Sequence, residues 1–352
     1  MMAKIKTKEV PLPGKIGFNL DSLVWPLLTL ALLLLFNLFF TPHFFHIEIK
    51  NGHLFGSLID ILNRAAPTML LAIGMTLVIA TAGIDISVGS VLAIAGAVAA
   101  VLIAKANAPL ILVFILPVVI AVILGAWNGM LISYVGIQPI IATLVLLTAG
   151  RGIAQLVTDG QIINFHSAAF EYIGGSTGFL FGLPFPIIVV VCIFMITQLI
   201  TRKTAVGLFI ESVGCNPTAS RYSGINDKSV KMMVYMFSGF CASIAGMITA
   251  SNIKAADPNS AGLNMEMDAI LAVVIGGTSM NGGKFSLAGS MIGALIMQSL
   301  TTTILTRGVP VQATLVVRAL VVVAVCLLQS EDFRKSLQTG VFTQVRGVKH
   351  EI

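Results

Sequence analysis

Charged side chains are scarce in this sequence. Only 10% of the 352 residues are Asp, Glu, Lys or Arg, whereas 57% are hydrophobic. A soluble chain of this length could not cover so much apolar surface with its polar side chains. The composition therefore excludes a soluble enzyme or binding domain and predicts a protein that crosses a membrane several times. It also leaves no polar domain to carry a nucleic-acid patch, so we expect no nucleic-acid partner despite the net charge of +6.

Metal-binding and disulfide patterns are also missing. The four cysteines form no CxxC pair, so we expect neither a disulfide framework nor a metal site. Gly174, Ser176 and Gly178 have the GxSxG spacing of a serine-hydrolase elbow. That elbow needs a strand before it and a helix after it, and neither is predicted here. We interpret the match as chance and expect no catalytic residue.

A phosphate-binding loop is absent as well. The nearest sequence is the GGK at residues 282–284, but Thr278 stands where the first glycine is needed. Phe285 follows Lys284, so no hydroxyl is placed for Mg²⁺. We therefore expect the chain to bind no cofactor and any ATP to be hydrolysed by a partner.

Long apolar runs are what the chain does have. A helix needs about 20 residues to cross the hydrocarbon core. Nine of the ten apolar runs approach or reach that length, and the run at residues 269–278 is too short to cross alone. The sequence predicts an all-α polytopic membrane protein with about ten transmembrane helices, some broken or short. We expect tails at residues 1–23 and 331–352 around a transmembrane domain at 24–330 with a polar loop at 202–231. The runs are Val24–Phe40, Ala65–Thr81, Ile86–Ala104, Leu110–Tyr134, Ile137–Val157, Leu183–Thr201, Met232–Ile253, Ala269–Thr278, Phe285–Leu305 and Val309–Gln329.

The basic residues predict the orientation. With the N-terminus inside and ten crossings, 14 of the 21 Lys and Arg residues fall on the cytoplasmic side and only five outside. Cytoplasmic loops of membrane proteins carry this excess. We therefore expect both termini and the polar loop to be cytoplasmic.

The polar loop contains a delimited short helix. Asn216 can accept the free N–H groups of a first turn, Pro217 suits the first helical position, and Gly224 can adopt the left-handed conformation that ends a helix. A helix of about two turns is not stable alone in water and must dock on something. The natural partner is another protein beneath the bilayer. The residues expected to contact it are Glu211, Asn216, Pro217, Ala219, Arg221, Tyr222 and Gly224.

Two glycine-rich interruptions divide the apolar pattern. The first, residues 80–90, contains Gly83 and Asp85, and the second, residues 276–285, begins with Gly276 and Gly277. Paired broken segments in the two halves of a transporter indicate its translocation site, because freed backbone groups are tolerated only in a cavity or inside protein. Two tight cytoplasmic turns are the alternative, and the halves do not align as a sequence repeat. We expect Asp85 to cap the helix from Ile86, and Asp268 to cap the short segment.

Three long stretches resemble the permeases of ATP-binding cassette (ABC) importers for ribose- and galactose-type sugars. Two resemble the family signatures: MTLVIATAGIDISVGSVLAIAGA at residues 75–97 and DAILAVVIGGTSMNGGKFSLAGSMIGALIM at 268–297. The third, ESVGCNPTASRYSGI at 211–225, resembles the ATPase-docking segment, although Cys215 stands where glycine is common. Residues 52–90 and 137–163 look most similar to the galactofuranose-type permeases.

The resemblance implies an inner-membrane permease that imports a monosaccharide, galactofuranose or a related pentose or hexose. It also implies an ABC ATPase, a second permease chain and a periplasmic sugar-binding protein as partners. The second permease is expected to be a different chain, with an identical copy as the alternative.

Polar residues inside the spans are the candidate substrate pathway. Charged groups at bilayer depth are costly and usually face a partner or a water-filled cavity. Arg151 and Gln155 lie one turn apart on one helix face, but Arg151 could equally satisfy backbone carbonyls of a neighbouring helix. For the other candidates a hydrogen bond between helices is the alternative, and Arg318 is expected to pair with a carboxylate. The candidates are Trp127, Asn128, Gln138, Arg151 and Gln155.

Two further features concern packing and competing functions. Gly125 with Gly129, and Gly289 with Gly293, have the small-residue spacing that lets membrane helices approach closely. An ion-coupled secondary transporter would need carboxylates within the spans, which contain almost none away from their ends. That carrier and an intramembrane enzyme remain the alternatives to ATP-coupled import.

Overall fold

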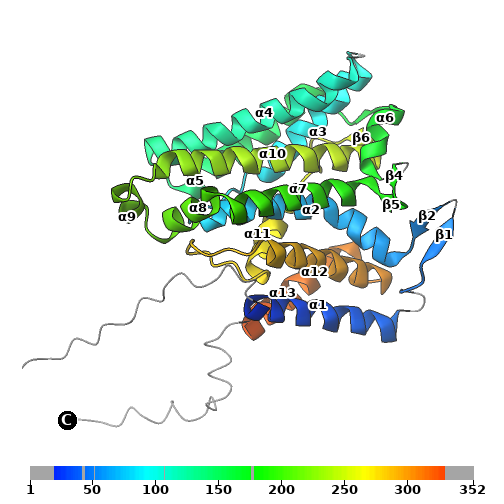
Figure 1. Cartoon of the computed structure of the whole chain (residues 1–352). Coiled ribbons are helices and arrows are strands. Elements are labelled where there is room, and N and C mark those ends of the chain that lie inside the picture. The colour runs from blue at the N-terminus through cyan, green and yellow to red at the C-terminus, as the bar shows by residue number, and fades with distance from the viewer. Residues whose placement is uncertain (1–19, 42–43, 51, 107, 176–177, 330–352) are drawn as a thin grey trace, which may run out of the picture.

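The computed structural model describes residues 20–41, 44–50, 52–106, 108–175 and 178–329, and these are mostly helical (Figure 1). The predicted tails lie outside the described residues, except that α1 already begins at Leu20. Ser176 of the GxSxG match also lies outside them.

The elements follow one another as long helices joined by short strands and loops. The helices are α1 (Leu20–Phe40), α2 (Ser57–Ala80), α3 (Val88–Ala104), α4 (Leu110–Met130), η1 (Leu131–Val135), α5 (Pro139–Thr158), α6 (Ala168–Glu171), η2 (Tyr172–Gly174), α7 (Phe185–Lys203), α8 (Ala205–Cys215), α9 (Pro217–Tyr222), α10 (Asp227–Ile253), α11 (Met265–Ile275), α12 (Leu287–Thr306) and α13 (Val311–Gln329). The strands are β1 (Glu48–Lys50), β2 (His53–Phe55), β3 (Ile163–Asn164), β4 (Phe179–Leu180), β5 (Leu183–Pro184) and β6 (Ala255–Ala256). They pair antiparallel as β1 with β2, β3 with β6, and β4 with β5.

Every apolar run is a helix in the structure, which confirms the polytopic helical fold. Seven helices among the described residues are long and apolar enough to cross a membrane: α1, α2, α4 with η1, α5, α7, α10 and α12. The helix α13 adds 19 residues, while α3 has 17 and α11 has 11. The short helix α3 follows the first glycine-rich sequence, and the short helix α11 precedes the second.

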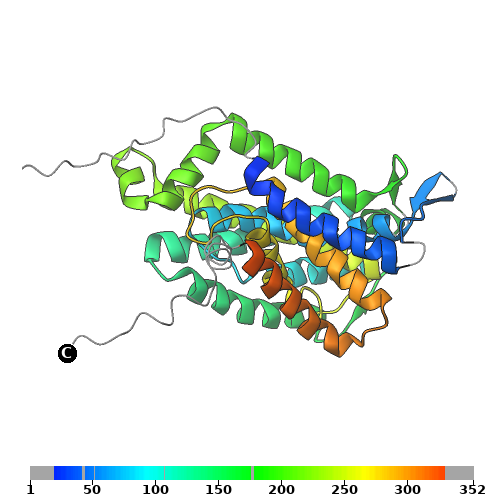
Figure 2. The same cartoon turned by 90° about the horizontal axis from the view of Figure 1, so that it is seen from below.

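The long helices run between two ends of the bundle. One end carries α8 and α9, and we call it the α9 end; the other carries the β1–β2 hairpin and α6, and we call it the β1 end (Figure 1). Seen from below, α1, α12 and α13 lie across one face (Figure 2). The helices α2 and α10 lie at the centre, and α2 is buried along nearly its whole length from Ala65 onward.

The chain builds two similar halves of opposite direction. In each half a long helix is followed by a linker, a short helix and two long helices: α2 to α5, then α10 to α13. The helix α2 runs from the β1 end to the α9 end, and α10 runs the opposite way (Figure 1). This arrangement is an inverted repeat of the kind found in transporters. The repeat is not visible in the sequence because the two halves share the order of their helices but not their amino acids.

Both short helices begin inside the bundle. The hydroxyl of Ser90, at the start of α3, donates to the carbonyl of Leu146 in the middle of α5, whereas Lys105 at the end of α3 pairs with Asp159 beyond α5, 2.5 Å away. The helix α11 starts beside α3: a Cβ added to Gly89 would overlap the carboxylate of Glu266. The two half-helices therefore start next to each other and diverge toward opposite ends.

Glycines allow the close helix contacts. A Cβ on Gly125 or Gly129 would overlap the backbone of α10, and one on Gly289 or Gly293 would overlap that of the α11 segment. The packing role predicted for both small-residue pairs is confirmed.

Candidate functional site

The helix α9 projects from one end of the bundle and has the predicted caps. The Asn216 side chain accepts from the backbone N–H of Ala219 at 3.0 Å, and Pro217 is the first helical residue. Gly224 has φ of 84°, the left-handed conformation expected of it. The helix has six residues, Pro217–Tyr222, which agrees with the predicted length of about two turns.

The side chains of α9 differ in what they contact. Arg221 donates two hydrogen bonds of 3.0 Å to the carboxylate of Asp227 at the start of α10. The hydrogen-bonded carboxylate raises the pKa of the Arg221 guanidinium above its ordinary value. Tyr222, by contrast, has 90% of its surface exposed. Arg221 therefore fixes α9 to the bundle, and Tyr222 is the large side chain presented outward.

A second helix, α8, was missed in the polar loop. Its 11 residues include Glu211, which is half-buried, and end at Cys215. The predictive signal was present, because Thr204 stands before an apolar run and its hydroxyl accepts from the Val206 N–H at 3.3 Å. Lysines and arginines flank this helix on both sides, and they give the loop its polar composition.

The helix α8 connects α9 to both glycine-rich interruptions. A Cβ on Gly214 would overlap the carbonyl oxygen of Ala80, the last residue of α2. The same carbonyl accepts from the N–H of Gly283 at 2.9 Å. One point at the α9 end thus joins α8, the end of α2 and the second interruption.

The first interruption is buried inside protein. The Asp85 carboxylate accepts from the Ser87 N–H at 3.1 Å, from the Ser87 hydroxyl at 2.6 Å and from the Ser238 hydroxyl at 2.9 Å. Ser238 lies in the middle of α10, and the Tyr235 hydroxyl donates to the Ile84 carbonyl at 3.2 Å. The segment turns at Thr81 and Ala82 next to the α9 end, and from Asp85 onward it lies inside the bundle. Asp85 therefore holds the bend before α3 but does not cap the helix, because α3 begins at Val88, two residues later than predicted, and Ser87 is the residue before it.

The second interruption is a turn at the α9 end. It joins α11 to α12, which pack antiparallel, so that Gly276 lies against Gly289. Gly277 has φ of 84° there, and the Thr278 hydroxyl accepts from the Ser286 N–H at 3.3 Å. The break that matches the first interruption is instead the linker at residues 254–264, before α11. Sequence analysis missed it because this linker is not glycine-rich.

The predicted pathway residues do not form one site. Trp127 is half exposed, whereas its neighbour Asn128 is buried and donates to the Ser87 hydroxyl at 2.9 Å. Gln138 precedes α5 near the α9 end, and Arg151 lies roughly 20 Å further along the axis. These side chains therefore lie in three separate places.

Arg151 and Gln155 hold the linker before α11. Arg151 donates to the carbonyl of Ala261, and the Gln155 amide donates to the Asn259 side chain at 2.7 Å. Arg151 thus satisfies a backbone carbonyl, as one of its two interpretations required, although that carbonyl belongs to the linker before α11 and not to a neighbouring helix. Its second terminal nitrogen is buried without a partner, so the group retains donor capacity.

Asp268 does not cap α11. The helix begins three residues earlier, at Met265, and the residue before it, Asn264, makes no side-chain cap. The carboxylate of Asp268 instead forms an ion pair with Arg318 of α13. The carboxylate partner expected for Arg318 is therefore confirmed, and the pair ties α11 to α13.

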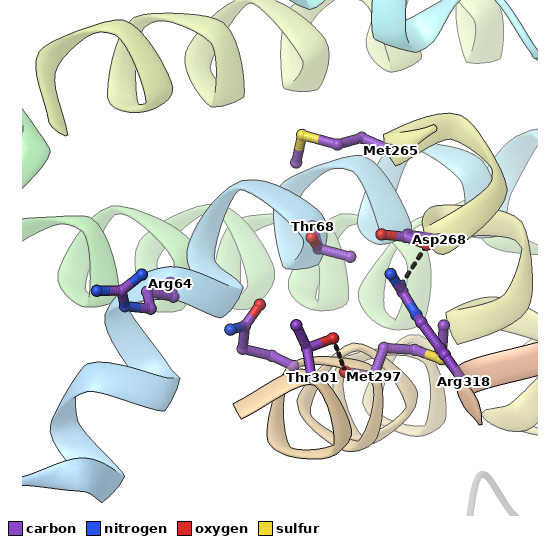
Figure 3. Close-up of a pocket in the computed structure, with 8 residues that line it drawn as sticks. Arg64, Thr68, Met265, Asp268, Met297, Thr301 and Arg318 are labelled. Atoms are coloured by element: carbon purple, nitrogen blue, oxygen red, sulfur yellow. Dashed lines mark hydrogen bonds and ion pairs between the residues drawn. The ribbon is translucent and has the colours of Figure 1, made fainter. Parts of the chain in front are cut away.

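The ion pair lies at a cavity of about 220 Å³ between α2, α11, α12 and α13 (Figure 3). Sequence analysis did not find this cavity, although its polar residues have helical spacing of three or four on α2 and α12. The cavity is lined by Arg64, Thr68, Met265, Asp268, Met297, Gln298, Thr301 and Arg318. Among the described residues, no group of three His, Cys, Asp or Glu side chains could hold a metal ion.

Comparison with known proteins relates the chain to a family of membrane permeases. Residues 57–326 match the family described as "Branched-chain amino acid transport system / permease component". The chain is 50% identical to the galactofuranose transporter permease protein YtfT of Escherichia coli K12, over 88% of this chain and 91% of that protein. It is 41% identical to the fructose import permease protein FruF of Bifidobacterium longum, over 88% of each chain. No solved structure matches.

A third relative is more distant. The ribose import permease protein RbsC of E. coli K12 is 36% identical over 83% of this chain and 88% of its own length. The family match at residues 57–326 runs from the start of α2 into α13, the part that forms the inverted repeat and the α8–α9 end. The chain therefore belongs to this permease family, as the membrane permease subunit, not itself catalytic, of an ABC importer.

Proposed function

We propose that the chain moves a monosaccharide, galactofuranose or a related pentose or hexose, inward across a bacterial inner membrane. The three relatives described above are named for galactofuranose, fructose and ribose. The similarity to YtfT extends over most of both chains, which supports galactofuranose as the first substrate to test. The chain binds no cofactor itself, and ATP is used by its partner.

The observation that carries the proposal is the α8–α9 end. A six-residue helix has little stability of its own, yet α9 is capped at both ends and fixed by Arg221 to α10. It presents Tyr222 outward and connects through α8 to the end of α2. An ABC ATPase that binds α9 would, when its subunits close, move α8, and the contact at Gly214 would carry that movement to the interrupted helices.

The positions of the basic residues support a cytoplasmic α9 end. Arg202, Lys203, Arg221, Lys228, Lys231 and Lys284 lie in the segments of that end, and Lys50, Arg64, Lys105, Lys254 and Arg307 lie toward the β1 end. The excess at the α9 end follows the positive-inside rule. The β1 end is then periplasmic and receives the sugar-binding protein, and both termini are cytoplasmic.

The outward face of α5 supports a second permease. Thr148 and Gln155 are exposed on it, and a Cβ on Gly152 between them would meet nothing within 4 Å. Polar and small side chains facing lipid gain nothing there, whereas they suit a helix interface or a hydrated path. We assign this face to the path between two permeases, with a different chain as the expected partner and an identical copy as the alternative.

Co-purification tests the docking site. The variant Tyr222→Asp is matched by Phe181→Asp, because these side chains are 90% and 91% exposed and lie at opposite ends. Purified in mild detergent, wild type and Phe181→Asp should retain an ATPase that Tyr222→Asp loses. Mass determination of the wild-type complex counts the permease chains.

Tyr222→Asp tests docking more specifically than Arg221→Glu would. Arg221→Glu would place a second carboxylate against Asp227 and disturb α9 itself.

Transport by vesicles that contain the chain without any ATPase would overturn the ABC assignment and favour an ion-coupled carrier.

A further inference from the structure

The cavity beside the Asp268–Arg318 pair belongs to none of the roles assigned so far. Three parts of the fold build it: one face of α2, one face of α12, and the ion pair between α11 and α13 (Figure 3). Its polar side chains are Arg64, Thr68, Asp268, Gln298, Thr301 and Arg318.

The cavity reaches from near the β1 end to the level at which α11 begins. Arg64 is exposed and lies seven residues after Ser57, roughly 10 Å along the axis of α2. Asp268 is in the first turn of α11, the half-helix that starts inside the bundle. In transporters with interrupted helices, substrates bind where such a half-helix begins. The cavity therefore lies between one entrance of the bundle and the interrupted segment.

The chemistry of the lining suits sugar hydroxyls. Each hydroxyl both donates and accepts, and the cavity offers guanidinium and amide donors together with carboxylate and amide acceptors. The Nε of Arg318 is buried without a hydrogen-bond partner, so this guanidinium keeps an unused donor. Hydrogen bonds to the charged pair would be the stronger ones. Because Asp268 neutralises Arg318, these groups can bind a neutral polyol without an additional counter-ion.

The size and the apolar part of the cavity agree with a small ligand. A volume of about 220 Å³ corresponds to roughly seven water molecules in the liquid. Met265 and Met297 complete the lining, and their flexible thioether chains can pack against the C–H groups of a sugar ring.

We propose that this cavity is a binding station for the monosaccharide within the permease, at which Gln298, Thr301 and the Asp268–Arg318 pair contact the sugar hydroxyls. The inference rests on the proposed function, because it assigns a stopping point to the same substrate. It differs from the α5 face, which borders the second permease.

Uptake by the reconstituted complex tests the station. Gln298→Leu and Thr301→Val each remove polar atoms from the cavity, and Thr249→Val is the matched control. The hydroxyls of Thr249 and Thr301 each donate to the carbonyl four residues earlier in their own helices, at 2.8 and 2.9 Å. Loss of one neutral hydrogen bond predicts uptake about three- to tenfold lower in the two cavity variants. ATP hydrolysis stimulated by the binding protein should persist, so less sugar enters per ATP.

Comparison of uptake rates for different sugars distinguishes loss of a direct sugar contact from a general packing defect. Galactofuranose, fructose and ribose place their hydroxyls differently, so cavity variants should change the ratios of their uptake rates, which a general packing defect would lower equally. If the cavity variants behave like Thr249→Val, or lower all rates in parallel, the station is refuted while the importer stands. If the wild-type complex takes up no monosaccharide, both proposals fall.

A labelling experiment gives an independent readout. Thr301→Cys is placed in a chain that keeps Cys215, which is exposed at the α9 end, and lacks the other cysteines. In detergent-solubilised complex, the transported sugar should slow reaction of Thr301→Cys with a small methanethiosulfonate and leave Cys215 unaffected. Equal rates at Thr301→Cys with and without sugar would contradict the station.

Discussion

Removal of one partner from the Asp268–Arg318 pair should destabilise the permease more than removal of both. The variants are Asp268→Leu, Arg318→Met and the double replacement. Breaking a buried ion pair by removing one partner costs about 3–5 kcal/mol, whereas replacing both groups by apolar ones is often neutral. The two side chains are 21% and 17% exposed, so the lower end of that range applies. Each single replacement should therefore cost about 3 kcal/mol, roughly a hundredfold in the unfolding equilibrium.

The two single variants should not be equal. Arg64 lines the same cavity. In Asp268→Leu two guanidinium groups share the cavity without any carboxylate, whereas in Arg318→Met the carboxylate of Asp268 still has Arg64 as a cation in the lining. We expect Asp268→Leu to be the more destabilised variant. The double variant should lie within about 1 kcal/mol of wild type.

The assay uses the buried Cys241 as the probe of unfolding. Its side chain is fully buried, so a thiol-reactive fluorophore reacts with it only when the bundle opens. With the other cysteines replaced, SDS titration in mixed micelles gives the free energy of unfolding for each variant. A double variant no more stable than the worse single variant would refute the ion-pair reasoning. If the station is correct, the double variant should fold but still transport poorly.

The remaining predictions concern the α9 end and the β1 end. Asn216→Ala should cost the α9 cap about 1 kcal/mol and weaken ATPase co-purification, whereas Asn226→Ala, which uncaps α10 instead, should retain the ATPase; equal loss in both would contradict this. Gly214→Ala should destabilise the chain by about 1–3 kcal/mol through overpacking and lower uptake per ATP, because its Cβ has no room; unchanged thermal unfolding would rule this out. The hydrogen bond from Lys254 holds the pKa of Glu171 below its ordinary value, so stability present at neutral pH should be lost as the pH falls through that lowered pKa. Thermal unfolding of Glu171→Gln should show a flatter acid dependence, and identical profiles would exclude the effect.

Local chemistry made much of the chain predictable. The lipid core requires about 20 apolar residues for each crossing, so the ten helical segments could be read directly from hydrophobic runs. Asn216, Pro217 and Gly224 delimited α9 because capping depends on the residue at one position and its immediate neighbours. Composition determined the membrane class, and the long signatures at residues 75–97 and 268–297 determined the permease family.

Only the tertiary structure decided which polar groups meet. Asp85 contacts Ser238, 153 residues away, and Arg151 reaches Ala261 across 110 residues, so neither partner could be read from local sequence. The inverted directions of α2 and α10 place α3 and α11 side by side, although the halves share no recognisable sequence. The cavity near Arg318 lies between three consecutive helices, α11 to α13, and α2, which is about 200 residues earlier in the chain. Sequence sets the apolar length and the caps of each helix, whereas burial of polar groups depends on how helices from both halves pack, and that packing positioned the candidate sugar station.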